Sequence, residues 1–384
     1  MPFIEQLLNG ENVEWKPLGE VCEYEQPSKY LVSSTMYNDS YPIPVLTAGK
    51  SFILGYTNEN FGIYKASEHQ TIIFDDFTTD IKWVDFDFKA KSSAMKMITS
   101  KDENIALLKF IYYWLCTLPQ ETNIGNHKRN WISKYTKLLI PLPPLSVQHK
   151  IVEILDKFTE LEAELEAELD CRKRQYEYYR NQLLSFDMLN RGQKLNGVKI
   201  MTLGEIAKYS STRIKSSCLC ETSFVGVDNL LQDRKGKTIS THVPTEGTFA
   251  EYQVGDILIG NIRPYLKKIW YADNSGGASG DVLVIHLTNE QIMSRYLYQV
   301  LADDKFFSYN MQHAKGAKMP RGNKQKIMEY KIPLPPLSVQ REIVEILDKF
   351  DTLCNSISEG LPKEIELRRK QYEYYRNQLL TFAQ

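Results

Sequence analysis

The side chains best suited to chemistry in this sequence are positively charged, and they gather in two stretches that contain no acidic residue. One stretch covers residues 122–152 and the other covers residues 305–328. Lysine and arginine without acidic neighbours suit contact with phosphate groups, so both stretches predict a nucleic-acid backbone as ligand. A solvated surface loop is the plainer alternative for any short charge run. The candidate contacts are Lys128, Arg129, Lys134, Lys315, Lys318, Arg321 and Lys324.

A third basic group is the segment NIRPYLKK at residues 261–268, which combines Arg263, Lys267 and Lys268 with Tyr265. This mixture suits contact with phosphates and with base edges, and it equally suits an ordinary turn at the end of a strand. We add Arg263 and Lys267 to the candidate DNA contacts. The net charge of the chain is −1, so only the distribution of charge, and not its sum, favours nucleic acid.

Patterns that would indicate catalysis or a bound cofactor are missing from the sequence. The segment ending in Gly236-Lys237-Thr238 resembles a phosphate-binding loop, but Leu231 stands where its first glycine should be. No GxSxG, HExxH or NPPY motif occurs, and the six histidines show no metal-ligand spacing. The six cysteines are scattered, which favours reduced thiols. We therefore predict no catalytic, cofactor-binding or metal-binding residue.

The elements that must position the basic groups belong to a tandem repeat. The nine residues IPLPPLSVQ occur at 140–148 and again at 332–340, an offset of 192. Arg129 and Arg321 share this offset, so one basic loop precedes each copy. Each copy opens a helix-like stretch that ends in QYEYYRNQLL, at 175–184 and 371–380, where the offset has grown to 196. The second helix therefore carries four additional residues, about one turn.

The apolar residues of both long stretches follow steps of three and four, which predicts coiled-coil helices. Neither helix can bury its apolar stripe alone, and antiparallel pairing within one chain is the simplest arrangement. Ser146 and Ser338 are the expected N-caps. Gly360 and Pro362 predict a kink or local break in the second helix. The segment TELEAELEAEL at 159–169 repeats a four-residue unit, and one unit more or less would shift the flanking parts by about 6 Å.

The segments that precede the helices differ in sequence but repeat one order of elements. Short β-like runs occur at 71–74, 94–98, 256–259 and 282–285, and helical stretches follow at 105–115 and 291–301. We expect two α+β domains of one fold. Aligning their strands places Thr78 opposite Arg263 and Lys82 opposite Lys267.

The duplicated I-P-L-P-P-L-S-x-Q helices, the QYEYYRNQLL ends, GDILIGNIRPYLKK at 255–268 and TELEAELEAEL together resemble the DNA-specificity subunit of type I restriction-modification systems. The resemblance covers nearly the whole chain. It implies an α+β protein with an internal pseudo-two-fold repeat, in which an intramolecular antiparallel coiled coil separates two target recognition domains. The expected boundaries are 1–144 for the first recognition domain, 145–190 for the central helix, 191–336 for the second recognition domain and 337–384 for the C-terminal helix.

The function implied by this resemblance is non-catalytic. Each recognition domain would bind one half of a split site in double-stranded DNA, and the helices would set the spacer. Two methyltransferase subunits would dock on the helices, and restriction and translocase subunits would join them. S-adenosylmethionine, ATP and Mg would be bound by those partners, and the specificity subunit itself would hold no cofactor. The lack of a signal peptide or long apolar run favours the cytoplasm. The alternative is a coiled-coil scaffold whose globular domains bind proteins.

Overall fold

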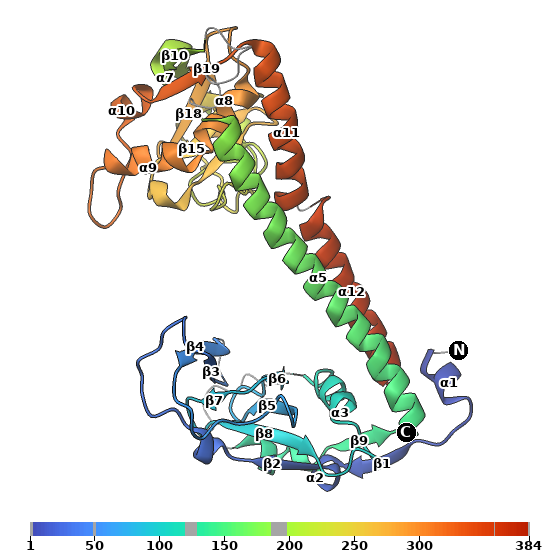
Figure 1. The fold of residues 1–384 in the computed structure, drawn as a ribbon. Coiled ribbons are helices and arrows are strands. Elements are labelled where there is room, and N and C mark those ends of the chain that lie inside the picture. The colour runs from blue at the N-terminus through green and yellow to red at the C-terminus, as the bar shows by residue number, and fades with distance from the viewer. Residues whose placement is uncertain (1–2, 49–50, 120–128, 186–197, 357, 383–384) are drawn as a thin grey trace. The chain divides into compact units, whose positions relative to one another are not determined.

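The computed structural model describes residues 3–48, 51–119, 129–185, 198–356 and 358–382 (Figure 1). The packing of the chain divides it into two compact units. Unit 1 comprises Met1–Glu164 and Ile365–Gln384, and unit 2 comprises Leu165–Glu364. Each unit therefore combines one globular domain with parts of the long helices.

The globular domain of unit 1 is built on an antiparallel sheet with the strand order β2-β8-β5-β6. A smaller sheet has the order β4-β3-β7, in which β3 and β7 run parallel. The strands of these sheets are β2 (Cys22–Glu25), β3 (Ile43–Leu46), β4 (Ile53–Thr57), β5 (Thr71–Asp75), β6 (Ile81–Val84), β7 (Lys89–Ala90) and β8 (Met95–Ser100). The remaining elements are α1 (Phe3–Leu8), β1 (Glu14–Pro17), α2 (Leu18–Val21), η1 (Pro27–Tyr30), α3 (Leu108–Leu115), α4 (Asn130–Ser133), η2 (Tyr135–Lys137) and β9 (Leu139–Leu142).

The globular domain of unit 2 repeats this plan, with an antiparallel sheet in the order β11-β18-β15-β16. A second sheet has the order β12-β14-β17-β13. The strands are β11 (Ala207–Tyr209), β12 (Arg213–Lys215), β13 (Phe224–Val225), β14 (Thr248–Tyr252), β15 (Ile257–Gly260), β16 (Ile269–Tyr271), β17 (Gly276–Ala278) and β18 (Val282–Leu287). The other elements are β10 (Lys199–Thr202), α7 (Leu203–Ile206), η3 (Ser216–Cys218), η4 (Pro264–Leu266), α8 (Ser294–Leu301), α9 (Asp304–Gln312), α10 (Lys324–Met328) and β19 (Lys331–Leu334).

These elements confirm the predicted α+β duplication. The four predicted β-like runs fall in β5, β8, β15 and β18, and the two predicted helices are α3 and α8. β5 and β15 are entirely buried, which explains why they appear in the sequence as short continuous apolar runs. α3 and α8 each begin three residues later than predicted, at Leu108 and Ser294.

The repeated IPLPPLSVQ segment forms a strand followed by a helix start in each unit. β9 pairs antiparallel with β1 and leads into α5 (Leu145–Leu183), and β19 pairs antiparallel with β10 and leads into α11 (Leu337–Asn355). The prediction that serine caps these helices is wrong. The N-cap of α11 is Pro336, which makes no side-chain cap bond, and Ser338 is the second residue of the helix. Ser146 occupies the same place in α5.

The glutamine that ends the repeat joins helix to domain in unit 1. Gln148 is fully buried, and its oxygen accepts a hydrogen bond from the backbone N–H of Leu107 at 3.0 Å. Its amide nitrogen donates to the carbonyls of Ile105 and Pro143, both at 2.9 Å. Leu107 is the N-cap of α3, so one side chain fixes the start of α3 to the start of α5.

Unit 2 repeats this junction with Gln340, which is also fully buried. Its oxygen accepts from the N–H of Met293, the N-cap of α8, at 2.8 Å. Its amide nitrogen donates to the carbonyls of Gln291 and Pro335 at 2.9 and 2.8 Å. The repeated glutamine is therefore a structural residue in both halves.

The repeated aspartate of VEILDKF makes a second contact to the same domain helix. In unit 2, Asp348 accepts from Arg295 Nε at 2.9 Å and from Gln299 Nε2 at 2.7 Å. In unit 1, Asp156 accepts a hydrogen bond from the Tyr113 hydroxyl and lies 3.6 Å from Lys109 Nζ. The partners on α3 and α8 differ, but their positions agree.

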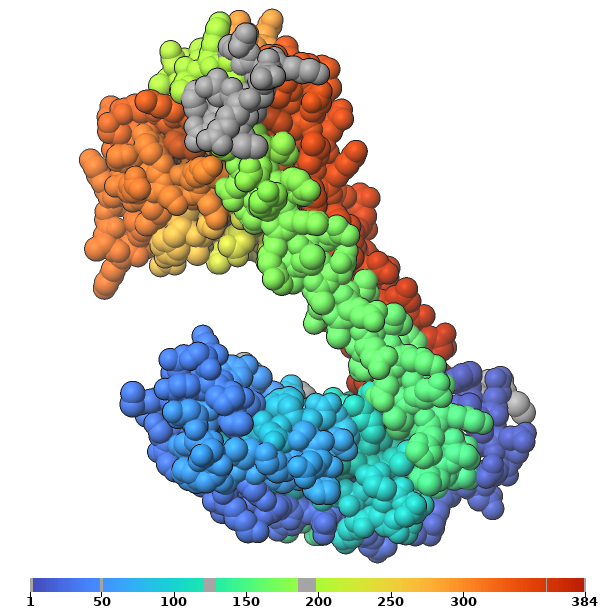
Figure 2. All heavy atoms as spheres, in the orientation of Figure 1, coloured from blue at the N-terminus to red at the C-terminus, as the bar shows by residue number. Residues whose placement is uncertain are grey.

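The long helices pack in antiparallel pairs within each unit. In unit 1, α5 pairs with α12 (Leu361–Leu380): the ring of Phe158 lies 5.4 Å from that of Tyr375. Glu162, one turn further along α5, forms an ion pair with Arg369, which precedes Tyr375 in α12, so the helices run in opposite directions. In unit 2, α5 packs against α11, and the two helices lie side by side in Figure 2.

The C-terminal helix is broken, as Gly360 and Pro362 predicted. α11 has 19 residues and α12 has 20, whereas α5 is one helix of 39 residues (Figure 1). The expectation that the second helix is longer by one turn is wrong, because its additional residues lie in the break and not in a helix. The physical reason is the conformation of Gly360, whose φ of +84° lies outside the helical region.

Each unit buries its own apolar core. The core of unit 1 joins Phe74, Ile111 and Trp131 of the domain to Ile151 of α5 and Leu379 of α12. The core of unit 2 joins domain residues to the second part of α5 and to α11. Among the described helices, none combines the length and apolarity required to cross a membrane.

Candidate nucleic-acid interface

The basic turn between β15 and β16 has an unusual backbone. Arg263 and Lys267 flank the short helix η4, and both adopt the left-handed conformation, with φ of 51° and 50°. Residues other than glycine adopt it at a cost, so surrounding contacts must hold them there. This turn therefore has a fixed shape that carries Arg263 and Tyr265 at its exposed surface.

The acid-free loop of unit 2 supplies those contacts. The N–H of Arg263 donates to the carbonyl of Pro320 at 2.7 Å, and the N–H of Gly322 donates to the carbonyl of Asn261 at 3.1 Å. Lys315 and Arg321 exchange two backbone hydrogen bonds, of 2.9 and 2.8 Å, which close the loop between them. The structure thus joins two segments that are about 60 residues apart in the sequence.

Most of the predicted contacts of unit 2 lie on this joined pair of loops. Arg321 forms a half-exposed ion pair with Asp281 at 3.1 Å, an arrangement of little energetic value in water. Within the described part of the chain, the other four side chains make no ion pair or hydrogen bond, and they are exposed: Arg263, Lys315, Lys318 and Lys324. Cationic groups held on a rigid backbone and left unpaired can bind phosphate without first breaking an internal contact.

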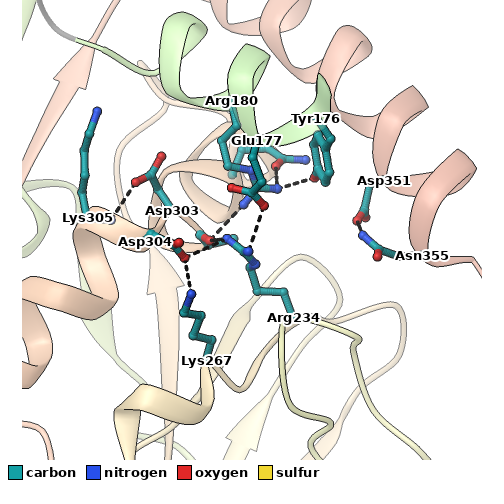
Figure 3. A network of polar contacts seen from close by, with 12 residues as sticks. Tyr176, Glu177, Arg180, Arg234, Lys267, Asp303, Asp304, Lys305, Asp351 and Asn355 are labelled. Carbon is teal, nitrogen blue, oxygen red and sulfur yellow. Dashed lines mark hydrogen bonds and ion pairs between the residues drawn. The ribbon is translucent and has the colours of Figure 1, made fainter. Parts of the chain in front are cut away.

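Lys267 differs from these residues, because its amino group is already engaged. Its Nζ lies 2.7 Å from Asp304 Oδ1, and Arg234 contacts the same oxygen at 3.2 Å (Figure 3). Arg234 also pairs with Glu177 of α5 at 2.9 Å and donates to the carbonyl of Ala302. The prediction from sequence did not include Arg234, although this residue ties the basic turn to α5.

A surface pocket of about 520 Å³ borders the two basic loops. Its walls include Arg263 and Met319 from those loops, with Ser240 and His242 from a neighbouring segment. Its lining is mixed: the basic groups of Arg263 and Lys268 suit phosphate contact and amide groups such as that of Asn229 suit base edges, beside the acids Asp228 and Asp281 and several apolar side chains.

The predicted contacts of unit 1 flank the short helix α4. Arg129 is its N-cap and Lys134 is its C-cap, and both are exposed. The N–H of Asn130 donates to the carbonyl of Asp76 at 3.1 Å, and the N–H of Trp131 donates to the Asp76 carboxylate at 2.9 Å. The remaining candidate, Lys128, lies outside the described residues.

An equivalent backbone hydrogen bond, here called the joint, holds each basic segment. In unit 1 the N–H of Asn130 donates to the carbonyl of Asp76, and in unit 2 the N–H of Gly322 donates to the carbonyl of Asn261, each at 3.1 Å. Arg129 and Arg321 directly precede the two donors, so the repeat places these arginines at equivalent positions.

The turns at this joint differ in length, and the sequence alignment of their lysines was wrong. Six residues separate Phe74 from its strand partner Ile81, whereas nine separate Ile259 from Ile269. Lys82 consequently lies within β6, paired with Ile73, and it is not equivalent to Lys267. The turn of unit 2 is therefore three residues longer than that of unit 1.

Beneath the loops of unit 2 lie two buried asparagines that sequence patterns did not indicate. Asn310 is fully buried and Asn261 is 5% exposed. Both amide atoms of Asn310 and the side-chain oxygen of Asn261 have no hydrogen-bond partner in the described structure. A Cβ on Gly322 would lie 2.3 Å from Asn310 Oδ1 and 2.7 Å from Asn261 Oδ1, so glycine is required there.

No metal centre is present among the described residues, since no three His, Cys, Asp or Glu side chains gather. The fold and the interface together define a class of protein: an internally duplicated recognition protein, in which two diverged α+β domains each present a basic loop and are joined by paired helices.

Comparison with known proteins assigns the family. The family model for the type I restriction modification DNA specificity domain matches residues 10–170 and again 196–367. The EcoR124I/EcoR124II type I restriction enzyme specificity subunit of Escherichia coli is 46% identical over 406 residues, covering 100% of this chain and 97% of the relative. A putative type I restriction enzyme specificity subunit of Haemophilus influenzae is 31% identical and covers 99% of this chain and 98% of its own length.

The fold agrees with this assignment. The crystal structure of a type I restriction-modification S subunit from M. genitalium matches 98% of both chains with a TM-score of 0.60 at 18% identity. The chain belongs to the type I restriction-modification DNA specificity family. Membership does not favour the alternative of a protein-binding scaffold.

Proposed function

We propose that this chain is the DNA sequence-recognition subunit of a type I restriction-modification complex, in which each globular domain binds one half of a bipartite site. The observation that carries this proposal is the repeated joint that places Arg129 and Arg321 at equivalent, exposed positions. Equivalent basic residues in two diverged domains are expected if both domains contact the DNA backbone and differ in the bases that they recognise.

The recognition domains in this proposal are residues 1–144 and 191–336, and the helical segments are 145–190 and 337–384. The subunit itself is non-catalytic. Two methyltransferase subunits and the restriction and translocase subunits supply the chemistry, with S-adenosylmethionine, ATP and Mg bound there. We infer that the complex acts on DNA in the cytoplasm. The related proteins carry the name of specificity subunit, which supports this division of labour.

The residues proposed to contact DNA fall into two groups by their present contacts. Arg321 and four cationic side chains that have no internal partner in the described structure are proposed to bind phosphates or base edges directly: Arg263, Lys315, Lys318 and Lys324. In the first domain, Arg129 and Lys134, which flank α4, are proposed to contact DNA in the same way. So is Lys128, which lies outside the described residues. Lys267 is proposed to act indirectly, because its ion pair with Asp304 holds the turn that carries Arg263.

Methylome sequencing of a host that expresses this chain with a cognate methyltransferase tests the proposal. The expected result is methylated adenine in a motif with two short specified parts and a non-specific spacer of fixed length. The control is the same host with the methyltransferase alone, which should leave that motif unmethylated. A motif without a spacer, or methylation that does not depend on this chain, would contradict the proposal.

A further inference from the structure

The helix pairing has two sides with the same number of helical residues. One side is a continuous helix and the other side is two shorter helices. α5 crosses from unit 1 into unit 2 as one helix of 39 residues. Its partners α11 and α12 have 19 and 20 residues, and residues 356–360 form the connector between them. The structure describes Ser356 and residues 358–360 of this connector.

The repeated aromatic residues mark where each partner helix contacts α5. In unit 1, Phe158 packs against Tyr372 and Tyr375, with ring centroids 6.4 and 5.4 Å apart. In unit 2, the equivalent Phe350 packs against Tyr176 and Tyr179 at 5.9 and 5.4 Å. Both contacts use the same residue types from the same repeat.

The number of residues between these contacts differs on the two sides. On α5, Tyr176 follows Phe158 by 18 residues, whereas on the partner side Tyr372 follows Phe350 by 22 residues. The two sides therefore differ by four residues. The two aromatic contacts are nevertheless the same, so the connector takes up this difference.

The connector is folded back on the end of α11. A Cβ on Gly360 would lie 2.5 Å from the carbonyl oxygen of Thr352 and 2.8 Å from that of Leu353. In a continuous helix, eight residues would separate these positions by about 12 Å along the axis. The fold-back is held in place, because Ser356 Oγ accepts from the N–H of Glu359 at 3.2 Å and Leu361 is buried.

The folded-back connector therefore spans less distance along the helix axis than the same residues would span in a helix. Straightening it would lengthen that span by several ångströms, which is comparable with the rise of about 6 Å for four helical residues. On α5, the tandem segment TELEAELEAEL lies between the two aromatic contacts. The partner sequence has no matching repeat. If α5 changes length within this segment, the connector must change the distance that it spans by the same amount.

We infer that the connector between α11 and α12 is a length-compensating joint. When α5 gains one four-residue unit, the connector extends, so that α11 keeps its contacts in unit 2 and α12 keeps its contacts in unit 1. A continuous partner helix could not do this, since the added unit also turns the helix by about 40° and would displace one of the two aromatic contacts. The joint lets the length of α5 change while the helix contacts within each unit stay the same.

This inference rests on the proposed function for its consequence in DNA, but its structural test does not. One ELEA unit is inserted after Ala167, where the second unit ends, in two backgrounds. One is the natural chain, and the other is a chain without residues 356–359, in which the partner side has 18 residues between its aromatic contacts, as α5 has. Both are purified as complexes with the methyltransferase. Thermal unfolding gives the cost of each insertion, and methylome sequencing gives the spacer.

The insertion should lower the unfolding midpoint of the natural chain only slightly and should lengthen the spacer by one or two base pairs, since DNA rises about 3.4 Å per base pair. In the shortened background the same insertion should lower the midpoint strongly and abolish methylation. A third chain with four residues added to the connector should tolerate two ELEA units. Equal costs in the natural and shortened backgrounds, or no benefit from the longer connector, would overturn the joint.

The shortened chain could fail to fold before any insertion. In that case the comparison between the natural and lengthened connectors still decides the matter, because both retain the fold-back and differ only in available length. A normal bipartite motif in the uninserted chain, with no effect of connector length, would reject the joint and leave the proposed function intact.

Discussion

At the scale of single residues, the structure separates positive charges that are available to a ligand from those that are already paired. Arg321 is exposed beside Asp281, and we expect it to exchange that weak ion pair for a phosphate contact. Arg321→Ala should weaken DNA binding by the assembled methyltransferase about tenfold, the usual worth of one charge-assisted hydrogen bond. It should also lower the slope of log affinity against log salt by about one.

The matched control for this substitution is Lys326→Ala. Lys326 lies in the same acid-free segment and also makes an exposed ion pair, with Glu329 at 2.7 Å. It differs from Arg321 in position, because it lies in α10 and outside residues 315–322, where the two basic loops are joined. Removing it should leave both affinity and salt slope nearly unchanged. Fluorescence anisotropy with a labelled duplex over a salt series measures both quantities, and unchanged affinity of Arg321→Ala at low salt would remove Arg321 from the interface.

Gly322→Ala tests whether the buried asparagines position the basic loops. The new methyl group would overlap Asn310 Oδ1 and Asn261 Oδ1, so the loop that carries Arg321 must shift away from the turn that carries Arg263. We expect affinity for DNA to fall about tenfold, as for loss of a direct contact. Gly280→Ala is the control, because nothing lies within 4 Å of a Cβ at that position. Equal affinities of the two variants would show that the packing between the two basic loops does not position the DNA-contacting residues.

The ion pair of Asp304 predicts a dependence of stability on pH. Burial raises the pKa of this carboxyl, but the hydrogen bond from Lys267 and the charge of Arg234 outweigh burial, and the pKa lies below its ordinary value of 3.8. A lowered pKa stabilises the fold above the unfolded value, and this stabilisation is lost as the pH falls through the folded pKa. Asp304→Asn should therefore lose less stability than the natural chain between pH 5 and about pH 3.

Urea unfolding across this pH range measures the difference. Glu329→Gln provides a control, since its ion pair with Lys326 lies on the exposed surface. If Asp304→Asn and the natural chain lose equal stability on acidification, Asp304 is not the group responsible.

Sequence patterns located much of the candidate site but not its internal contacts. The acid-free loops and the 192-residue offset correctly placed Arg129 and Arg321 at equivalent positions. Sequence could not show that Lys267 is paired, because its partner Asp304 lies 37 residues further along the chain. It also could not find Asn310, since a buried polar residue is recognised only when its surroundings are known.

At the scale of elements, two repeated side chains connect each long helix to a domain whose sequence has diverged. Gln340 binds the first residues of α8 and Asp348 binds Arg295 further along it. The partner of the glutamine is a backbone N–H, which is available whatever the domain's side chains are. This explains how the domains can change while the junction stays the same.

Gln340→Ala should destabilise unit 2 by about 1–3 kcal/mol, because it leaves the partly buried N–H of Met293 and two carbonyls without partners. Ser338→Ala is the matched control: Ser338 is exposed in the first turn and makes no cap bond, so its loss should have little effect. Denaturant unfolding of both variants measures the difference. A larger effect of Ser338→Ala would restore serine as the residue that starts the helix.

The periodicity of apolar residues predicted both helices and their pairing, and Gly360 and Pro362 predicted the break. Helical length was predicted wrongly, because a stutter in the apolar stripe fits either one more turn of helix or a looped insertion. The contact of Gly360 with the Thr352 carbonyl, which decides between them, depends on the folded chain.

At the scale of the whole molecule, the chain is duplicated: its repeated helices and junctions are structural, and its two diverged domains recognise DNA. Its net charge of −1 fits a subunit that contacts DNA through local basic loops and shares the remaining contacts with its partners. The central claim is that each domain recognises its own half-site. Duplication alone does not establish this claim, because two similar domains could also bind one continuous site.

Hydroxyl-radical footprinting of complexes that carry Arg129→Ala or Arg321→Ala tests this claim most directly. Each substitution removes one of the two equivalent arginines from the DNA backbone, so each should weaken backbone protection at one half of the motif only. The two variants should affect opposite halves and leave the specified bases and the spacer unchanged. The account is contradicted if both substitutions alter the same half, or if either one alters both halves equally.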